Sequence, residues 1–179
     1  MFKFLLILAA LGGIAFFLST NYTNRFNALK KKIEDARARL LDVLNERFTL
    51  VQKLDDRLDD TEKIGRSAVA SALKTSERAT ITESIVEIGL LIGETTAHLE
   101  RATMQLRNPN ITKKGDSVDS ILDELEENSR QLKLAKREYN NGVRDYNKMT
   151  EVGPSSWVAT LFKYETKSLC LGPHERSAD

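Results

Sequence analysis

The sequence has few of the residues that build disulfides, metal centres or nucleophilic active sites. It contains one cysteine, Cys170, and two histidines, His98 and His174, in 179 residues. A single cysteine excludes an intramolecular disulfide. No set of thiols or carboxylates at ligand spacing surrounds either histidine, and no Glu-x-x-His pair is present for a di-iron site in a helical bundle. We therefore expect no metal site and no cofactor.

The charged residues form no pattern that is typical of an active site. The acidic pairs at 55–56, 59–60 and 126–127 occupy adjacent positions, and adjacent side chains point in different directions on a helix. Catalysis needs titratable groups that converge in one pocket. Lys plus Arg is 27 and Asp plus Glu is 26, a balance that gives no argument for a nucleic-acid partner. We predict a protein that is not an enzyme, has no catalytic residues and binds no nucleic acid.

Proline and aromatic residues are also scarce. The chain has three prolines and 7% aromatic residues, whereas 30% of its residues are charged. This balance favours long solvated helices over a thick globular core. Gly65 is the first glycine after Gly13, and no proline precedes Pro109, so little interrupts a helix in the first hundred residues. The predicted fold class is all-α.

One long hydrophobic run is present, at residues 4–18, which contain no charged or strongly polar side chain. As a helix this run covers about 22 Å, short of the ~30 Å hydrocarbon core of a bilayer. Two flanking residues on each side bring it close to spanning length. We expect residues 1–20 to be an uncleaved membrane anchor. A cleavable signal peptide is the alternative, although no small-x-small pair marks a cleavage site and no cysteine follows for a lipoprotein.

Basic residues lie mostly after this run. Only Lys3 precedes it. Within about twenty residues after it come Arg25, the cluster Lys30, Lys31 and Lys32, and then Arg37. The positive-inside rule then places the long C-terminal region in the cytoplasm. The lysine cluster is also a candidate for contact with anionic lipid, worth about 1 kcal/mol per residue near such a surface. Determination of topology explains the same cluster without any lipid contact.

Three amphipathic stretches follow the anchor, each with apolar residues at steps of three and four, as in packed helices. The first runs through Tyr22, Phe26, Leu29, Ile33, Ala36, Leu40, Leu44, Val51, Leu54 and Leu58. The second runs through Ile81, Ile85, Ile88, Ile92, Thr95, Leu99, Ala102 and Leu106. The third runs through Val118, Ile121, Leu125, Leu132, Ala135, Tyr139, Val143, Tyr146 and Met149.

Breaks between these stretches come from capping residues and prolines. Residues 59–62, Asp-Asp-Thr-Glu, have N-cap chemistry that would let a second helix fold back; one unbroken rod is the alternative. Pro109 ends the second helix, and Gly153-Pro154 ends the third before a short helix through Phe162. We predict an antiparallel bundle of three long helices plus a short C-terminal helix at residues 21–165, followed by a flexible polar tail at 166–179.

Two Tyr-Asn pairs stand out in the third stretch, Tyr139-Asn140 and Tyr146-Asn147. They are seven residues apart, close to two helical turns, so both tyrosines share one face and the asparagines lie one step round. Tyrosine buries its ring while its hydroxyl needs a partner, and asparagine can bond a neighbouring helix or a nearby backbone group. We predict a helix fastening in which polar atoms set the register.

The residues around these pairs resemble the C-terminal signature of the LemA family of bacterial membrane-anchored proteins. The signature reads Ala-Lys-Arg-Glu-Tyr-Asn-x-x-Val-x-Asp-Tyr-Asn at 135–147, then Pro154 and Val158-Ala159-x-Leu161-Phe162-x-Tyr164. Residues 22–27 and 41–47 are similar to N-terminal pieces of the family. Three motifs of the family are replaced here, at 52–55, 60–62 and 168–170, which indicates a divergent member.

The resemblance implies an N-terminal membrane helix, an antiparallel bundle of three long helices and a short one, and no known enzymatic activity. From it we expect a single-pass protein of the bacterial inner membrane, with a cytoplasmic bundle that acts as a scaffold and recruits protein partners in the cell envelope. The alternative is a self-assembling homo-oligomer or lattice that organises the membrane or builds a magnetosome-like organelle. Three stripes of similar length fit a bundle within one chain and favour the first reading.

Overall fold

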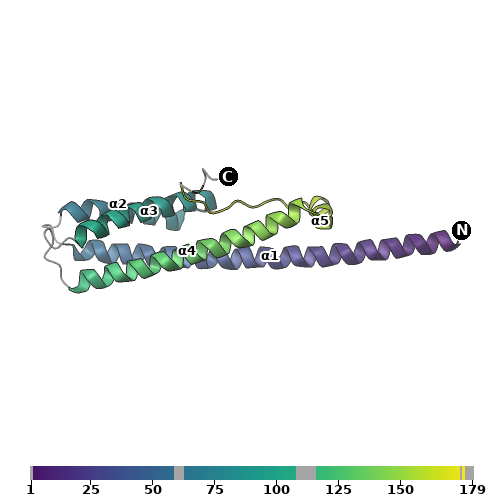
Figure 1. Ribbon diagram of the computed structural model, residues 1–179, viewed down its shortest axis with the longest axis horizontal. Coiled ribbons are helices and arrows are strands. Elements are labelled where there is room, and N and C mark those ends of the chain that lie inside the picture. Colours follow the sequence, from purple (N-terminus) through teal and green to yellow (C-terminus); the bar gives the residue numbers. More distant parts are fainter. Residues whose placement is uncertain (1, 59–62, 108–115, 174, 176–179) are drawn as a thin grey trace. The chain divides into compact units, whose positions relative to one another are not determined.

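The computed structural model describes residues 2–58, 63–107, 116–173 and 175. Over these residues it contains five helices and no strand, which confirms the predicted all-α fold. Figure 1 shows the helices α1 (Phe2–Arg57), α2 (Lys63–Ile81), α3 (Ile85–Leu106), α4 (Asp116–Glu151) and α5 (Pro154–Phe162). The predicted caps at 59–62 and the predicted stop at Pro109 lie outside the described residues.

The chain forms two compact units, and α1 and α4 contribute to both. The first unit consists of Met1–Asp35 and Asn141–Lys167, and the second of Ala36–Asn140 and Ser168–Asp179. Each unit has its own buried residues and is described by itself below.

The second unit is a helical bundle built from one segment of α1, from α2 and α3, and from one segment of α4. Each segment brings an apolar stripe to a common core, as the spacing of its hydrophobic residues predicts. Full burial of one such aliphatic side chain is worth about 1.5–3 kcal/mol. The core residues are Leu50, Val51, Leu54, Leu58, Ala68, Val69, Ala72, Leu99, Ala102, Leu106, Val118, Ile121, Leu122 and Leu125.

The second predicted long helix is in fact a hairpin of two helices, α2 and α3, which Figure 1 shows side by side. The predicted stripe starts at Ile81, but Ile81 ends α2 and is 76% exposed. Ser84 caps α3 by accepting a hydrogen bond from the Glu87 N–H at 3.4 Å. The Ser-x-x-Glu pattern at this point is a capping box at the level of sequence, and it outweighs the continuing apolar period.

Small residues let α2 and α3 approach closely. Ala68, Ala72 and Ala79 are buried on α2. A Cβ atom added at Gly65 would lie 2.7 Å from the Leu106 Cδ2 atom, so a side chain at residue 65 would displace Leu106. The small side chains at 65–79 therefore serve packing within the hairpin.

The first unit is centred on three aromatic rings. Phe26 is fully buried, packs edge-on against Tyr146 with ring centroids 5.6 Å apart, and stacks on Tyr164 at 4.5 Å. Edge-on and offset arrangements are the favoured geometries of aromatic pairs. These contacts join the part of α1 that follows the apolar run to the C-terminal end of α4 and to the chain after α5.

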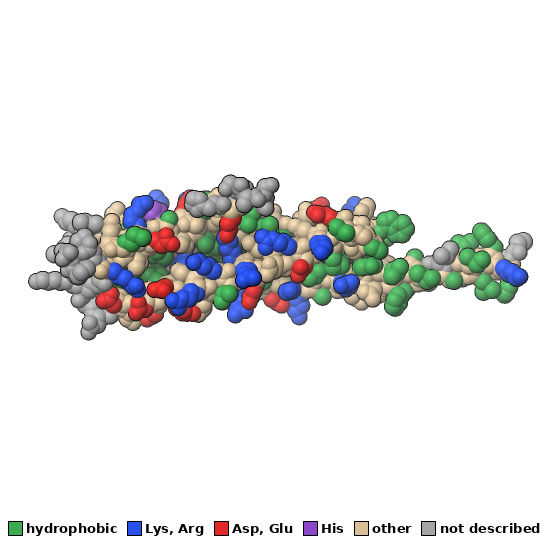
Figure 2. All heavy atoms as spheres, in the orientation of Figure 1, with side chains coloured by type: hydrophobic (Ala, Val, Ile, Leu, Met, Phe, Trp, Pro, Cys, Tyr) green, Lys and Arg blue, Asp and Glu red, His purple; other side chains and the backbone are tan. Residues whose placement is uncertain are grey.

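The apolar run itself carries exposed side chains in the same unit, seen along the N-terminal part of α1 in Figure 2. Phe4, Ile7, Ile14 and Phe17 are each more than half exposed. Within the described residues, α1 is the one helix long and apolar enough to cross a membrane, with a mean hydropathy of 2.2 in its most apolar window. An apolar surface of this size, exposed on all sides, fits a membrane-associated protein.

Candidate functional site

The first Tyr-Asn pair binds the backbone of the C-terminal segment within the second unit. The Asn140 Nδ2 atom donates to the Cys170 carbonyl at 3.0 Å, and the Cys170 N–H donates to Asn140 Oδ1 at 2.8 Å. The Tyr139 hydroxyl donates to the Ser168 carbonyl at 3.1 Å. One side-chain amide thus satisfies both backbone groups of a buried residue, as a neighbouring strand would.

The second pair repeats this contact within the first unit. Asn147 Nδ2 donates to the Lys167 carbonyl at 2.9 Å, and the Lys167 N–H donates to Asn147 Oδ1 at 2.8 Å.

The predicted fastening is therefore one of a helix to a backbone, rather than of a helix to a helix. Tyr139 and Tyr146 are both buried, at 4% and 1% exposed, as the sequence predicted. Burial raises the pKa of both phenols, with Cys170 also raising that of Tyr139 and Tyr164 that of Tyr146. Both hydroxyls stay neutral at physiological pH. The polar segment after residue 166, expected to be flexible, is packed over residues 167–172.

The C-terminal segment lies in a seat, by which we mean the surface formed by the first Tyr-Asn pair of α4 and by Gly89 and Gly93 of α3. The two glycines form the wall on the α3 side. A Cβ atom at Gly89 would lie 2.5 Å from the Leu171 carbonyl oxygen, and one at Gly93 would lie 2.6 Å from Pro173 Cδ. The absence of side chains at these positions lets the segment approach the α3 backbone. These two glycines therefore permit close approach of the C-terminal segment to α3.

Cys170 anchors the segment as a buried apolar side chain. It is 0% exposed, and burial raises the pKa of its thiol to about 11, with Lys136 acting in the opposite direction. A thiol with a raised pKa holds little thiolate at neutral pH and reacts slowly. Its role here is packing.

Arg47 lies at the centre of a buried polar cluster in the second unit. It is 1% exposed and donates from Nε to Asn128 Oδ1 at 3.1 Å, from one NH group to Thr96 Oγ1 at 3.1 Å, and from the other to Ser129 Oγ at 2.6 Å. All three acceptors are neutral side chains. Burial lowers the pKa of Arg47 to about 10, so the guanidinium remains charged at neutral pH.

Asn128 extends this cluster to the surface. Its Nδ2 atom donates to the Val43 carbonyl at 3.1 Å and to Glu46 Oε2 at 3.2 Å. The carboxylate of Glu46 is exposed and reaches the arginine only through this amide. Each nitrogen of the buried guanidinium therefore donates one hydrogen bond, but the charge has little direct compensation by an opposite charge.

Sequence analysis named Arg47 only within a motif and did not name Asn128, although both leave a signal. The first predicted stripe steps from Leu44 to Val51, and the third from Leu125 to Leu132. The seam position skipped in each stripe holds Arg47 in one and Asn128 in the other. Two polar residues at core positions of two helices predict a bonded pair, since buried polar groups need partners.

A groove of about 770 Å³ lies between α3 and α4 beside this cluster. Its apolar walls come from both helices, Arg47, Thr96 and Ser129 line it, and Gly172 and Pro173 of the C-terminal segment lie at its edge. The apolar lining residues include Ile92, Ala97, Leu99, Met104, Leu122, Leu125 and Leu132. Such a groove suits an apolar chain that carries one acidic group toward Arg47.

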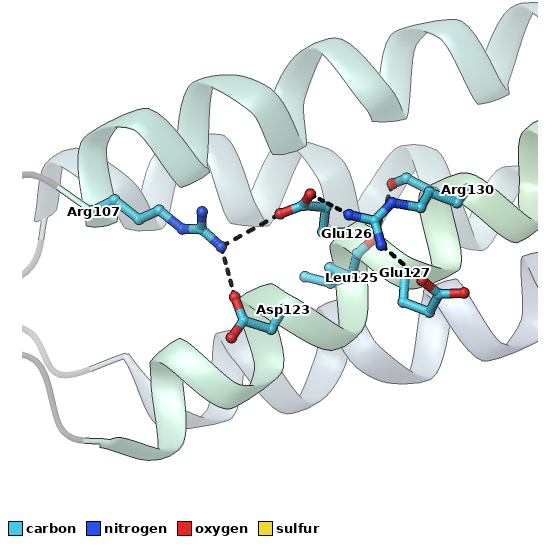
Figure 3. Close-up of polar contacts among 7 residues, drawn as sticks. Arg107, Asp123, Leu125, Glu126, Glu127 and Arg130 are labelled. Atoms are coloured by element: carbon cyan, nitrogen blue, oxygen red, sulfur yellow. Dashed lines mark hydrogen bonds and ion pairs between the residues drawn. The ribbon is translucent and has the colours of Figure 1, made fainter.

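The rim of the groove carries ion pairs that largely neutralise its exposed basic residues. Figure 3 shows Arg107, the residue directly after α3, bonded to Asp123 at 2.8 Å and close to Glu126 at 3.7 Å, both on α4. Arg130 bonds Glu126 at 2.8 Å and Glu127 at 3.0 Å. Exposed pairs of this kind add little stability; those of Arg107 reach across to α4, whereas those of Arg130 lie within α4. The deep positive charge in the groove is that of Arg47.

The three lysines predicted for lipid contact have different surroundings in the first unit. Lys30 Nζ lies 4.7 Å above the Tyr164 ring, and Lys32 Nζ lies 4.0 Å from Asp145 Oδ2. Lys31 is exposed. The last predicted site residue, Pro154, is the first residue of α5, directly after Gly153 at a φ of 73°. The sequence predicted that Gly153-Pro154 ends the third long helix; in the structure α4 ends at Glu151, and Pro154 begins the short helix.

Comparison with protein families now identifies the chain. A sequence model of the LemA family matches residues 36–177. The chain belongs to the LemA family. The match covers both Tyr-Asn pairs, the groove and the seat of the C-terminal segment, whereas residues 22–27, where we noted a further likeness, precede it. Comparison with curated proteins gives no match.

The seat in this LemA protein can be tested through its one cysteine. We expect Gly89→Ala to displace the segment, because the new Cβ meets the Leu171 backbone, and so to expose Cys170. Labelling of Cys170 by a thiol reagent at pH 8 should then accelerate by about tenfold or more, since the thiolate is the reactive form. Gly13→Ala, with open space around its Cβ, is the matched control. Equal rates in the two variants would contradict the seat.

The Arg47 cluster can be tested by removing one partner or both. Arg47→Met leaves the Asn128 Oδ1 atom without its donor, and we expect the free energy of unfolding to fall by about 1–3 kcal/mol. Arg47→Met combined with Asn128→Leu should recover most of that loss, because the stranded amide is removed as well. The Thr96 and Ser129 hydroxyls lose Arg47 but still donate to backbone carbonyls. Urea unfolding of the full chain in detergent measures both. A double variant as unstable as the single one would show that the guanidinium itself stabilises the fold.

Proposed function

We propose that this LemA protein is a membrane-anchored, non-enzymatic scaffold whose bundle recruits a protein partner through the groove between α3 and α4. The observation that carries the proposal is Arg47, a 1% exposed guanidinium beside the groove whose three acceptors are neutral. Burial of a charge without a direct counter-charge costs stability. A cost of this kind is expected where a partner supplies the missing negative charge.

The geometry favours an extended acidic segment of a protein as the partner. The groove adjoins a seat in which the helices already hold a non-helical segment, and Gly172 and Pro173 belong to both. Its apolar walls would cover aliphatic side chains, while Arg47 would bind a carboxylate. Arginine binds carboxylates with two parallel hydrogen bonds.

The titratable groups support a role without catalysis. Among the described residues with a clear shift, burial raises the pKa of Cys170 to about 11 and raises the pKa of Tyr139 and Tyr146 above their ordinary value. The pKa of Arg47, lowered to about 10, remains well above neutrality. General acid–base catalysis works best with a pKa near the operating pH, and these groups lie far from it.

We further propose that residues 2–18 cross the bacterial inner membrane and that the bundle is cytoplasmic. The basic residues that follow the run, Arg25 and Lys30 to Lys32, support this orientation. Lys31 is exposed and is the lysine of the cluster best placed to meet anionic lipid headgroups.

A pair of reporters fused after Asp179 tests this orientation. Alkaline phosphatase is active outside the cytoplasm and green fluorescent protein is active within it. We expect a fluorescent fusion and an inactive phosphatase fusion in bacterial cells, with both chains present at equal levels in the membrane fraction. An active phosphatase would contradict the cytoplasmic bundle, and recovery of both fusions in the soluble fraction would contradict the anchor.

Photo-crosslinking tests recruitment through the groove. A photoreactive residue at Met104, which is 75% exposed and lines the groove, is compared with one at Leu134, which is 60% exposed on α4 and outside the lining. We expect a discrete protein adduct at 104 and none at 134. The double variant at Arg47 and Asn128 should reduce this adduct about tenfold or more, as expected for loss of a buried charge pair.

The outcomes of this experiment separate the two functions considered for the chain. An adduct with a second copy of the chain would contradict recruitment and favour the self-assembling lattice. Equal adducts at 104 and 134, or an adduct that is indifferent to Arg47, would show that the groove selects no partner.

A further inference from the structure

Helix α5 exposes large apolar side chains although the residues behind it are buried. Trp157 is 82% exposed and Leu161 is 73% exposed. Residues four apart lie on the same side of a helix, so these two form one face. The opposite face packs into the first unit through Ser155, Val158 and Ala159, which are buried. A short helix that is apolar on both faces is typical of one that is covered on both faces.

The hydroxyl groups of α5 bond backbone carbonyls of the helix itself or of the two residues before it. The Ser155 hydroxyl donates to the Val152 carbonyl at 2.9 Å, that of Ser156 to Gly153 at 2.8 Å, and that of Thr160 to Ser156 at 3.0 Å. Hydroxyls that bond their own helix backbone do not need water. This leaves the exposed face of α5 suited to an environment with little water.

The C-terminal end of α5 is closed in the same way. Lys163 adopts a left-handed conformation with a φ of 55°. Its N–H donates to the Thr160 carbonyl at 3.4 Å, and the Tyr164 N–H donates to Ala159 at 2.9 Å. The last turn of the helix thus has partners for carbonyl groups that helices usually leave to solvent.

The contacts of the first unit place α5 beside the part of α1 that follows the apolar run. Tyr164, directly after α5, stacks on Phe26 and lies below Lys30. Phe26 follows Leu18 by eight residues, which is about 12 Å of helix. When residues 2–18 fill the hydrocarbon core, this part of α1 leaves the membrane through the headgroup layer. Figure 2 shows hydrophobic side chains on both parts of the unit.

Basic residues outnumber acidic ones in the first unit. Over residues 2–35 and 141–167 the chain has nine Lys and Arg residues and five Asp and Glu residues, which include Glu151 and Glu165 on either side of α5. Arg25, Lys31, Lys148 and Lys163 are exposed, and this surplus of positive charge suits an anionic lipid surface. Tryptophan and basic residues are typical of segments that lie at the membrane–water interface. A second copy of this chain or another protein would explain the apolar face of α5, but would leave the neighbouring basic residues without a role.

We infer that α5 is an interfacial helix whose Trp157 and Leu161 insert at the boundary of headgroups and acyl chains, in the leaflet next to the bundle. The inference rests on the anchor in the proposed function and adds a second membrane contact. It makes the first unit a two-point attachment, in which α1 crosses the bilayer and α5 lies along its surface.

Trp157 is the sole tryptophan of the chain, so its fluorescence reports on α5 directly. The full-length protein is reconstituted in vesicles of phosphatidylglycerol and phosphatidylethanolamine, with or without lipids brominated near the headgroup end of the acyl chain. We expect a blue-shifted emission and roughly a twofold loss of intensity with the brominated lipid, since interfacial helices lie about 5–10 Å into the headgroup–acyl boundary. Bromine at the acyl terminus should quench less.

A second reporter distinguishes failure of this inference from failure of the anchor. Trp157→Phe combined with Phe16→Trp moves the tryptophan into the apolar run, at a position 75% exposed in the structure. Quenching at residue 16 without quenching at Trp157 would overturn the interfacial helix and leave the anchor standing. Lack of quenching at both would overturn both. A blue-shifted Trp157 that brominated lipid does not quench would show that protein covers α5, and would also overturn the inference.

Discussion

The organisation of this protein depends on the hydrogen bonds between asparagine side chains and the backbone of the C-terminal segment. A buried peptide group without partners costs about 1–3 kcal/mol, and the segment at 167–172 has no neighbouring strand to supply them. Asn140 and Asn147 supply both a donor and an acceptor to Cys170 and Lys167. Because these hydrogen bonds are with the backbone, they do not depend on the side chains of the segment, to which the buried Cys170 side chain adds packing. The glycines of α3 complete the seat, and the seat determines where the groove between α3 and α4 begins.

The buried Arg47 carries a charge that has hydrogen-bond partners but no direct counter-charge. Three neutral acceptors and a pKa lowered to about 10 describe a charge that is hydrogen-bonded but poorly compensated. Apolar side chains of similar volume commonly give equal or greater stability at such sites. Arg47 thus differs from the aliphatic core around it, because packing alone does not require a charge at this position. It also lines the groove between α3 and α4.

The helices of this chain could be predicted from sequence because apolar spacing and the scarcity of proline act locally. Burial at Phe26, Leu40, Val51 and the two signature tyrosines follows directly from that spacing. The break at residues 82–84 was missed because the apolar period continues through it, while the cap at Ser84 is a weaker signal in sequence. The seat of the C-terminal segment could not be predicted in the same way. Its partners are backbone groups, which every residue carries and which no pattern of side chains marks.

The exposed face of α5 and the groove between α3 and α4 differ in whether their polar groups still need a partner. On α5 the hydroxyls of Ser155, Ser156 and Thr160 bond backbone carbonyls of the helix or of the residues just before it. The exposed apolar face therefore needs no polar partner from whatever covers it. Beside the α3–α4 groove, Arg47 retains a charge that neutral acceptors do not cancel. Lipid satisfies the first requirement but not the second, because an acyl chain offers no acceptor. An acidic peptide satisfies the second, since it brings a carboxylate together with apolar side chains. The hydrogen bonding of each surface thus argues for a different neighbour.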